Sequence, residues 1–438
     1  MPRHTLLIAA LAASAVATLQ AQIPDSVLIR RALALHRQVP MIDGHNDLPW
    51  KIRAHGSDSY TADAARNPMF ALDSLDLSRP QPGLQTDIAR LRAGGVGAQF
   101  WSTWVPNEVV NNGSARIEWE QIDIVHRMVA RYPRAFVLAR TAADIERAHR
   151  EGRIAGLIGI EGGHAIENSL ALLRAYYSAG ARYMTLTHNT TLAWADAAAD
   201  SARHNGLTPF GLEVVREMNR LGMLVDLAHV SDSVMVQAMR TSAAPVIFSH
   251  SSARAIANRP RNVPDDILRM VTTNGGVVLV NFYCDFVSHA RAERTNARST
   301  AARELRARFL AANDSAGYRG ALSAWDAAHP EPPAPTLGEV ADHIDHIRQV
   351  AGIDHVGYGS DFDGIDCAPQ GLEDVSTFPR LTAELLRRGY SDADAKKVIG
   401  LNVLRVMRQA EAVSARLRRE RGPSTASLFS LDSAGVTR

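Results

Sequence analysis

The sequence predicts one α/β domain with the (β/α)8 architecture, a TIM-type barrel of parallel strands surrounded by helices. Eight apolar runs recur along the chain, and most are rich in Val, Ile, Leu and Met without strict alternation, as in strands buried on both faces. Segments with helical character lie between them. The chain has 438 residues, 46% of them hydrophobic, so it can bury one large core. Eight such units over this length favour a barrel.

The predicted strands differ in their polar content. The first run, VPMIDGHND, and the last, HVGYGSDFDG, are the most interrupted by polar residues. An open doubly wound sheet is the main alternative, but its usual Gly-rich phosphate turn is absent, because GLIGIEGG places its glycines inside a strand. The strands are expected at residues 39–47, 94–105, 154–163, 181–189, 222–230, 244–252, 275–283 and 355–364.

Helices are predicted from apolar spacing and from residues that start or stop them. In the segment 114–132, Ile117, Ile122, Val125 and Met128 fall on roughly one side. The segment 264–276 begins with Pro and acidic residues and ends in Gly, the asymmetry that helices favour. The predicted helices are 114–132, 169–180, 231–242, 264–276 and 337–352.

Two regions do not fit the strand–helix repeat. Residues 50–90 are expected to form a long irregular connection. Residues 286–335 are rich in Ala and Arg and contain HPEPPAP near their end, so we expect a partly helical insertion between the seventh and eighth strands. It could cover a pocket or add to a subunit contact.

The ends of the chain predict export. Residues 1–21 begin with Arg3, continue with an apolar run that is short for a membrane span, and end at Ala21, as in a secretory signal peptide. Residues 22–412 would form the domain, and residues 413–438 a polar, mobile tail. There is no Cys near the cleavage point to carry a lipid, and the C-terminal segment is not apolar. We therefore expect no stable membrane anchor. We therefore expect a periplasmic or secreted protein.

Charge and cysteine content exclude several classes of protein. The formal net charge is +2, and no stripe of Lys and Arg indicates a nucleic-acid partner. The chain has two cysteines, Cys284 and Cys367, which excludes a disulfide-dense scaffold. Whether these two form a disulfide stays open at this point.

Residues of metal-ligand type lie at the predicted strand ends. Catalytic groups of a (β/α)8 barrel project from the carboxyl ends of its strands, so these side chains should meet above one barrel mouth. Residues two apart on a strand point the same way, so two of them can come from the first strand. The residues are His45, Asp47, Glu161, His188, His229, His250 and Asp361.

This convergence predicts two divalent metal ions. Carboxylates packed side by side repel unless a cation neutralises them, and mixed nitrogen and carboxylate ligation suits zinc. Glu161 has two carboxylate oxygens, so it can bridge the ions. His45 and Asp47 would complete one site, and His229 and His250 the other. A water between the ions would become a hydroxide nucleophile near neutral pH.

These residues occur in motifs that resemble a known family. From about residue 40 to 405 the chain is similar to the membrane (renal-type) dipeptidases, the M19 peptidases, whose barrels are amidohydrolase-like. The resemblance implies hydrolysis of dipeptides at a binuclear zinc site, tolerance of a D-residue at the C-terminus, cleavage of carbapenem-like β-lactams, and a homodimer. The motifs are DGHNDLPW, GIEGGHAI, LTHNTTLAWAD, DLAHVS, FSHSSAR, RPRNVPDD, NFY and GSDFDG.

The resemblance also implies residue roles. His188 of LTHN would hold the substrate carbonyl oxygen, Arg261 of RNVPDD would bind the free C-terminal carboxylate, and Asp361 of GSDFDG would shuttle protons. The chemistry agrees, because amide hydrolysis needs an oxyanion stabiliser and an acid for the leaving amine, and Arg matches a carboxylate. Two alternatives stay open: Arg261 in a surface salt bridge with Asp265 or Asp266, and Asp363 in place of Asp361. The metal ligands implied are His45, Asp47, Glu161, His229 and His250.

We therefore expect an exported, zinc-dependent dipeptidase that needs a free C-terminal carboxylate. A related metallohydrolase acting on another amide or a lactone is the first alternative. A non-catalytic binding protein is the second, but it would have no need of Asp361 beside a water-activating metal pair.

Overall fold

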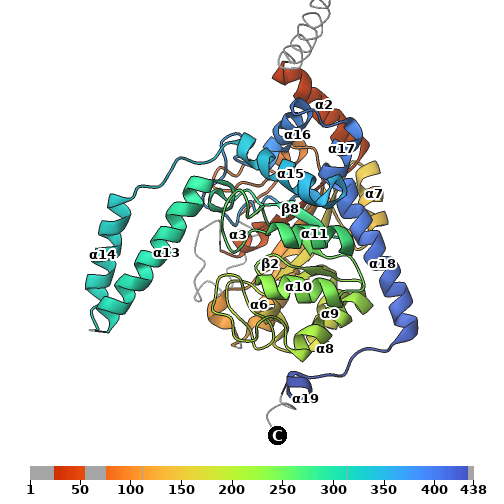
Figure 1. Cartoon of the computed structure of the whole chain (residues 1–438). Helices are drawn as coiled ribbons and strands as arrows, with labels where there is room; N and C mark the ends of the chain where they lie inside the picture. Colours follow the sequence, from red (N-terminus) through yellow and green to blue (C-terminus); the bar gives the residue numbers. More distant parts are fainter. Residues whose placement is uncertain (1–23, 55–74, 111, 312, 433–438) are drawn as a thin grey trace, which may run out of the picture.

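A closed barrel of parallel strands forms the centre of the molecule. The computed structural model describes residues 24–54, 75–110, 112–311 and 313–432. Within them, the strands pair in the ring β1–β2–β4–β5–β6–β7–β8–β9, and β9 pairs back to β1, with helices around the outside (Figure 1). The predicted (β/α)8 barrel is therefore confirmed. The strands are β1 (Met41–Asn46), β2 (Val96–Trp104), β4 (Ile154–Glu161), β5 (Ala181–Thr185), β6 (Leu224–Asp226), β7 (Ile247–Phe248), β8 (Val277–Val280) and β9 (Val356–Tyr358).

A further strand, β3 (Phe136–Leu138), lies beside the barrel and was not predicted. It pairs with the first residues of β4, from Ile154 to Gly156, whereas β5 pairs with β4 from Ile158 onward. The reason it escaped prediction is its length of three residues, of which only Phe136 is buried. Such a run is too short to show a period.

The five predicted helices are present, with ends within two residues of those expected. Polar side chains cap several of them: Ser231 accepts from the Val234 amide at the start of α10, and Thr336 forms a capping box with Glu339 at the start of α15. The helices are α6 (Ser114–Arg131), α8 (Leu170–Ala179), α10 (Asp232–Thr241), α11 (Asp265–Asn274) and α15 (Leu337–Ala351).

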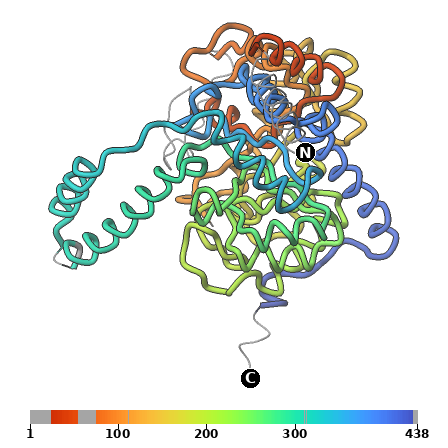
Figure 2. The backbone as a smooth tube through the Cα atoms, turned by 45° about the horizontal axis from the view of Figure 1, so that its top comes forward, coloured from red at the N-terminus to blue at the C-terminus, as the bar shows by residue number. Residues whose placement is uncertain are grey.

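Other helices complete the outer layer. In both views α18 lies along one side of the barrel (Figures 1 and 2). The longer ones are α2 (Asp25–Gln38), α7 (Ala142–Arg150), α9 (Pro209–Leu221), α16 (Phe378–Arg387) and α18 (Asn402–Glu420); the short ones are α3 (Leu48–Arg53), α5 (Ile88–Ala93), α17 (Asp392–Lys396) and α19 (Leu428–Asp432).

A cluster of fully buried side chains packs within the barrel strands and against α7 and α18. It includes Phe100, Tyr183 and Leu279, none of which has exposed surface. The Tyr183 ring lies against Gly159, where an added Cβ would come within 2.0 Å of the ring. Glycine at 159 therefore leaves the space that lets the phenol of Tyr183 extend toward the end of β1.

The insertion between the last two barrel strands, β8 and β9, is helical and projects from the body (Figures 1 and 2). It contains α12 (Cys284–Val287), α13 (His289–Leu310) and α14 (Ser315–Ala328). No described residue of α14 is buried, and Arg298 of α13 holds it through Asp326. The prediction of a partly helical insertion agrees with this arrangement.

The C-terminal part follows the barrel further than expected. The predicted start of the tail at residue 413 falls inside α18, which continues to Glu420. Beyond it, the Asp432 carboxylate accepts hydrogen bonds from the Thr208 hydroxyl (2.6 Å) and the Phe210 amide (2.9 Å) at the start of α9. The predicted signal peptide, residues 1–21, lies outside the described residues. Among the helices of the described ranges, none is both long and apolar enough to cross a bilayer.

One buried carboxyl lies outside the cluster of strand-end residues. Glu118 of α6 has no exposed surface, and its Oε1 lies 2.6 Å from the Thr103 hydroxyl, which is also 3.1 Å from the Gly159 carbonyl oxygen. Burial raises the pKa of Glu118 to about 8. The protonated acid can donate a hydrogen bond to the Thr103 hydroxyl, which in turn donates to the Gly159 carbonyl oxygen.

Glu118→Gln is expected to make the protein more stable at pH 8 and to leave it nearly unchanged at pH 5. The folded-state pKa of Glu118 lies above the unfolded value, so its contribution is present below about pH 4.5 and is lost as the pH rises toward 8. The amide keeps the donor without titrating. Urea unfolding at both pH values should give a gain of roughly 3–4 kcal/mol at pH 8. An equal difference at both pH values would contradict the assignment.

Candidate active site

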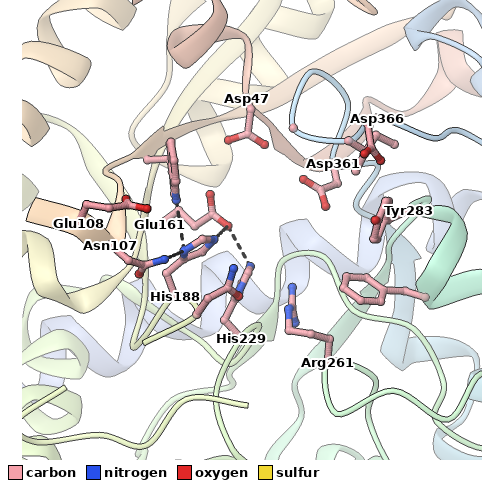
Figure 3. A pocket seen from close by; sticks show the side chains of 15 residues that line it. Asp47, Asn107, Glu108, Glu161, His188, His229, Arg261, Tyr283, Asp361 and Asp366 are labelled. Carbon is pink, nitrogen blue, oxygen red and sulfur yellow. Dashed lines mark hydrogen bonds and ion pairs between the residues drawn. The ribbon is translucent and has the colours of Figure 1, made fainter. Parts of the chain in front are cut away.

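The strand-end residues meet around one cavity of about 580 Å³ at the barrel mouth (Figure 3). Asp47 follows β1, Glu161 ends β4, and Asp361 follows β9. Of the sequence-predicted residues, Asp47, Glu161, His188, His229, Arg261 and Asp361 line the cavity. The other two, His45 and His250, are buried, and their ring atoms lie within 4 Å of Glu161.

Glu161 lies at the centre of this arrangement. Its Oε2 is 3.4 Å from His45 Nε2 and accepts a hydrogen bond from Ser102 at 3.1 Å. Its other oxygen, Oε1, is 3.0 Å from His229 Nε2 and 3.6 Å from His250 Nε2. One oxygen of this carboxylate therefore faces His45, and the other faces His229 and His250.

Two groups of side chains can each hold a metal ion. The ligand atoms of His45, Asp47 and Glu161 lie within 4.8 Å of one another, and so do those of Glu161, His229 and His250. A third combination joins His45 and His250 with Asp361. Imidazole nitrogens and carboxylate oxygens at this spacing suit a transition metal such as zinc.

The Nε2 atoms of the three buried histidines fit a metal better than a hydrogen-bond network. His45 Nε2 is buried without a hydrogen-bond partner. The Nε2 atoms of His229 and His250 face each other at 2.9 Å, and burial, which disfavours the charged form, holds the pKa of each well below the usual value. Neutral imidazoles present lone pairs, as metal ligands must.

Neighbouring carboxylates raise the pKa of His45 and of Asp361. Burial opposes a charge on His45, but Tyr183, Glu161 and Asp47 raise its pKa well above the usual value. Burial also raises the pKa of Asp361 well above its usual value, and the charges of Asp47 and Glu161 add to this effect. A cation between these groups would relieve the repulsion.

The second nitrogen of each buried histidine has a partner that the sequence did not reveal. His45 Nδ1 lies 2.9 Å from the Tyr183 hydroxyl, and His229 Nδ1 lies 3.1 Å from Asn189 Oδ1. His250 Nδ1 lies 2.8 Å from the Ser249 hydroxyl, which donates to Asp226 at 2.6 Å. Such partners orient ligand rings and set their tautomers. Asn189 follows His188 directly, and Ser249 precedes His250, so neighbouring polar residues were the available signal.

Two residues of the site have left-handed backbone conformations. His229 has φ 67° and Asp361 has φ 67°, although neither is glycine. Such conformations cost free energy and persist where surrounding structure enforces them. Both side chains line the cavity, so these strained positions belong to the site itself.

The structure separates Asp361 from its sequence competitor. Asp361 lines the cavity, and its Oδ2 accepts from Asn281 Nδ2 at 2.8 Å. The Asp363 carboxylate instead accepts from the Gln85 amide at 2.8 Å and is not among the lining residues. Asp361 is therefore the one of the two that can reach a bound molecule.

Arg261 lies in the wall of the cavity and not in a surface salt bridge. It is 5% exposed, its Nη2 donates to the His250 carbonyl oxygen at 3.4 Å, and its Cζ is 5.2 Å from the Phe286 ring centroid. Its Nε and Nη1 are buried without partners. Asp265, a partner that the sequence suggested, binds His346. A buried guanidinium with free donors is stabilised when an anion binds to it.

The Cys284–Cys367 disulfide, left open by the sequence, is present. It joins residues 83 apart, with Cα atoms 5.6 Å apart. Cys284 follows Tyr283, a lining residue after β8, and Cys367 follows Asp366, a lining residue after β9. The bond therefore holds together two segments of the cavity wall.

Comparison with known proteins identifies the family. The family model for membrane dipeptidases (peptidase family M19) matches residues 29–421. The chain belongs to this family. It is 40% identical over 401 residues to dipeptidase verJ from Clonostachys rogersoniana, covering 89% of each chain, and 39% identical over 394 residues to dipeptidase 3 from Rattus norvegicus, covering 89% of this chain and 69% of the relative. This M19 protein is a metallo-dipeptidase, as its motifs suggested.

Two solved peptidase structures share its fold. The probable dipeptidase PvdM from Pseudomonas aeruginosa has a TM-score of 0.73 at 24% identity, covering 89% of this chain and 99% of that one. A metallopeptidase from Rhodobacter sphaeroides, liganded with a phosphinate mimic of L-Ala-D-Ala, has a TM-score of 0.66 at 24% identity, covering 85% and 99%. Because both identities are below 25%, these structural similarities support the barrel fold of the M19 dipeptidase and nothing further.

Proposed function

We propose that this enzyme hydrolyses dipeptides with a free C-terminal carboxylate, using two zinc ions bridged by Glu161. One observation carries the proposal: the two oxygens of Glu161 face separate ligand sets, and the same cavity contains a buried Arg261 with free donors. The first feature supports paired cations. The second supports an anionic group on the substrate.

The chain would hold the ions through five side chains. His45 and Asp47 would hold one ion, His229 and His250 would hold the other, and Glu161 belongs to both groups. When bound, the ions lower the pKa of a water between them and polarise the carbonyl of the scissile bond. Tyr183, Asn189 and Ser249 keep the rings in place through the opposite nitrogens.

The remaining lining residues would bind the substrate and move its protons. Arg261 binds the C-terminal carboxylate with a planar pair of donors. His188 Nε2, 3.8 Å from Glu161 Oε1, faces the same cavity and donates to the carbonyl oxygen as charge develops there. Asp361, which lines the cavity and accepts a hydrogen bond from Asn281, accepts the proton of the attacking water and delivers it to the leaving amine.

A substrate panel tests this reaction against the alternative of another amide or a lactone. Zinc-loaded enzyme is incubated with L-Ala-L-Ala, the same dipeptide with an amidated C-terminus, tri-alanine, N-acetyl-alanine and a γ-lactone. Cleavage of the unblocked dipeptide alone supports the proposal. Cleavage of N-acetyl-alanine or the lactone, with the dipeptide intact, would support the alternative.

Arg261→Met should remove the recognition of the free carboxylate. We expect kcat/KM for L-Ala-L-Ala to fall roughly 10²-fold or more, because a buried charge pair loses one partner. The rate with the amidated dipeptide should stay at its low level. Arg259→Met is the matched control, since Arg259 binds Asn296 and does not line the cavity. An equal loss on both substrates would argue against carboxylate binding by Arg261.

A D-residue at the second position should also be accepted. Arg261 would fix the carboxylate, and a cavity of about 580 Å³ leaves room for a side chain of either hand. The mimic of L-Ala-D-Ala bound by the relative from Rhodobacter sphaeroides supports the same idea. Comparing kcat/KM for L-Ala-L-Ala and L-Ala-D-Ala tests it directly.

We also propose that the mature enzyme is exported without a stable membrane anchor and works as a homodimer. The disulfide supports an oxidising compartment, the periplasm or the exterior, where such bonds persist. None of the residues lining the cavity comes from α13 or α14, which leaves the projecting pair free for a subunit contact. N-terminal sequencing of the exported protein and its mass in solution test these points.

A further inference from the structure

His188 has two ring nitrogens in different surroundings. Nε2 faces the cavity, 3.8 Å from Glu161 Oε1 (Figure 3). Nδ1 points away from the cavity centre toward two nitrogen groups: Asn107 Nδ2 at 3.0 Å and Trp104 Nε1 at 3.4 Å. Trp104 ends β2, and Asn107 begins the short turn that follows it. The surroundings of Nδ1 therefore decide what Nε2 can do.

The indole of Trp104 settles the direction of these hydrogen bonds. An indole N–H can only donate, so His188 Nδ1 must be the acceptor and carries no proton. Asn107 then also presents its NH₂ group to the same lone pair. Trp50 packs edge-on against Trp104, with ring centroids 4.7 Å apart, and keeps the indole in this orientation. A doubly protonated His188 would place Nδ1–H against two donors, so the ring is neutral with its proton on Nε2.

We propose that Trp104 and Asn107 are positioning residues that hold neutral His188 in the tautomer with its proton on Nε2, so that this atom donates to the carbonyl oxygen of the scissile bond. This inference rests on the proposed function of His188. The opposite tautomer would turn a lone pair toward the oxygen on which negative charge develops. The donor is thus present before the substrate binds, and no proton has to be rearranged during the reaction.

Asn107→Asp is the variant that tests the tautomer. A carboxylate at this position can only accept a hydrogen bond, so it favours a proton on Nδ1, and the ring either changes to the opposite tautomer or becomes doubly protonated. We expect kcat to fall roughly 10²-fold, as when one oxyanion donor is lost, with little change in KM. Trp104→Phe removes the obligatory donor and lets the Asn107 amide turn over, so both tautomers should be populated and kcat should fall by a smaller factor.

The tautomer is read directly by NMR of zinc-loaded enzyme labelled with ¹⁵N-histidine, with the His188 signals assigned through their loss in His188→Gln. Wild type should show a protonated Nε2 and an unprotonated Nδ1. Asn107→Asp should move the proton to Nδ1 or protonate both atoms. Asn189→Asp is the matched control for the spectrum: Asn189 Oδ1 is the acceptor for His229 Nδ1, so a carboxylate there keeps the existing direction and leaves the His188 signals in place.

Three results would overturn the inference: a wild-type His188 with its proton on Nδ1, an Asn107→Asp spectrum unchanged while kcat falls, or a changed tautomer with unchanged kcat. Metal content and circular dichroism of each variant identify a fold or ligand defect, and Trp104→Phe then serves as the second test. If the wild type cleaves no dipeptide, the proposed function fails, and the spectrum still reports the tautomer by itself.

Discussion

In the proposed two-zinc site, Glu161→Gln is expected to lose at least one metal ion, and kcat/KM should fall roughly 10³-fold or more. One carboxylate contributes an oxygen to each ligand group, and the substitution replaces one of these oxygens with an NH₂ group that cannot ligate. A metal-activated water would no longer form near neutral pH, and this removes the nucleophile. Metal content by mass spectrometry and kcat/KM for L-Ala-L-Ala give the two readouts.

Glu118→Gln is the matched control for Glu161→Gln. Both glutamates are buried, but Glu118 contacts Thr103 on the helix side of β2 and lies outside the cavity. The control should bind two ions and keep its activity at pH 7. Retention of two tightly bound ions by Glu161→Gln would show that Glu161 does not bridge them.

Asp361→Asn is expected to lower kcat roughly 10²–10⁴-fold, the usual effect of losing a general acid–base group, while both ions stay bound. The amide fills the same volume but cannot accept the proton of water and pass it to the leaving amine. Each metal group retains its own ligands, since neither the set around His45, Asp47 and Glu161 nor the set with His229 and His250 requires this residue.

Asp363→Asn is the control, with the same substitution two residues away. Its carboxylate accepts from the Gln85 amide and does not line the cavity, so its activity should resemble that of wild type. Loss of activity in Asp363→Asn, with a functional Asp361→Asn, would assign the proton shuttle to Asp363. Loss of metal in Asp361→Asn would make this residue a ligand, as the group of His45, His250 and Asp361 would allow.

The barrel and the position of its site could be predicted because both depend on local features of the sequence. Long apolar runs such as β4 are buried along their whole length, and this property appears as uninterrupted hydrophobicity. Ligand-type residues such as Glu161 and His250 stand at or just beyond the ends of these runs. In a parallel barrel all such ends meet at one mouth, so position in sequence predicts position in space.

The partners of the site residues could not be predicted, because they depend on packing. Tyr183 reads as a core aromatic, and its hydroxyl reaches His45 only because Gly159 leaves space beside its ring. Trp104 reads as the end of an apolar strand, and its contact with His188 depends on the direction of an indole held by Trp50. The three-residue strand β3 and the projection of α13 and α14 likewise follow from tertiary contacts and not from periodicity.

The covalent link between Cys284 and Cys367 makes assembly of the substrate pocket depend on redox conditions. The disulfide links two segments of the cavity wall. One segment contains Tyr283 and Phe286, and the other contains Asp361 and Asp366. A newly made chain in a reducing cytoplasm would carry these two segments untethered. Reduction of this bond is therefore expected to loosen one wall of the pocket, and oxidation to fix it.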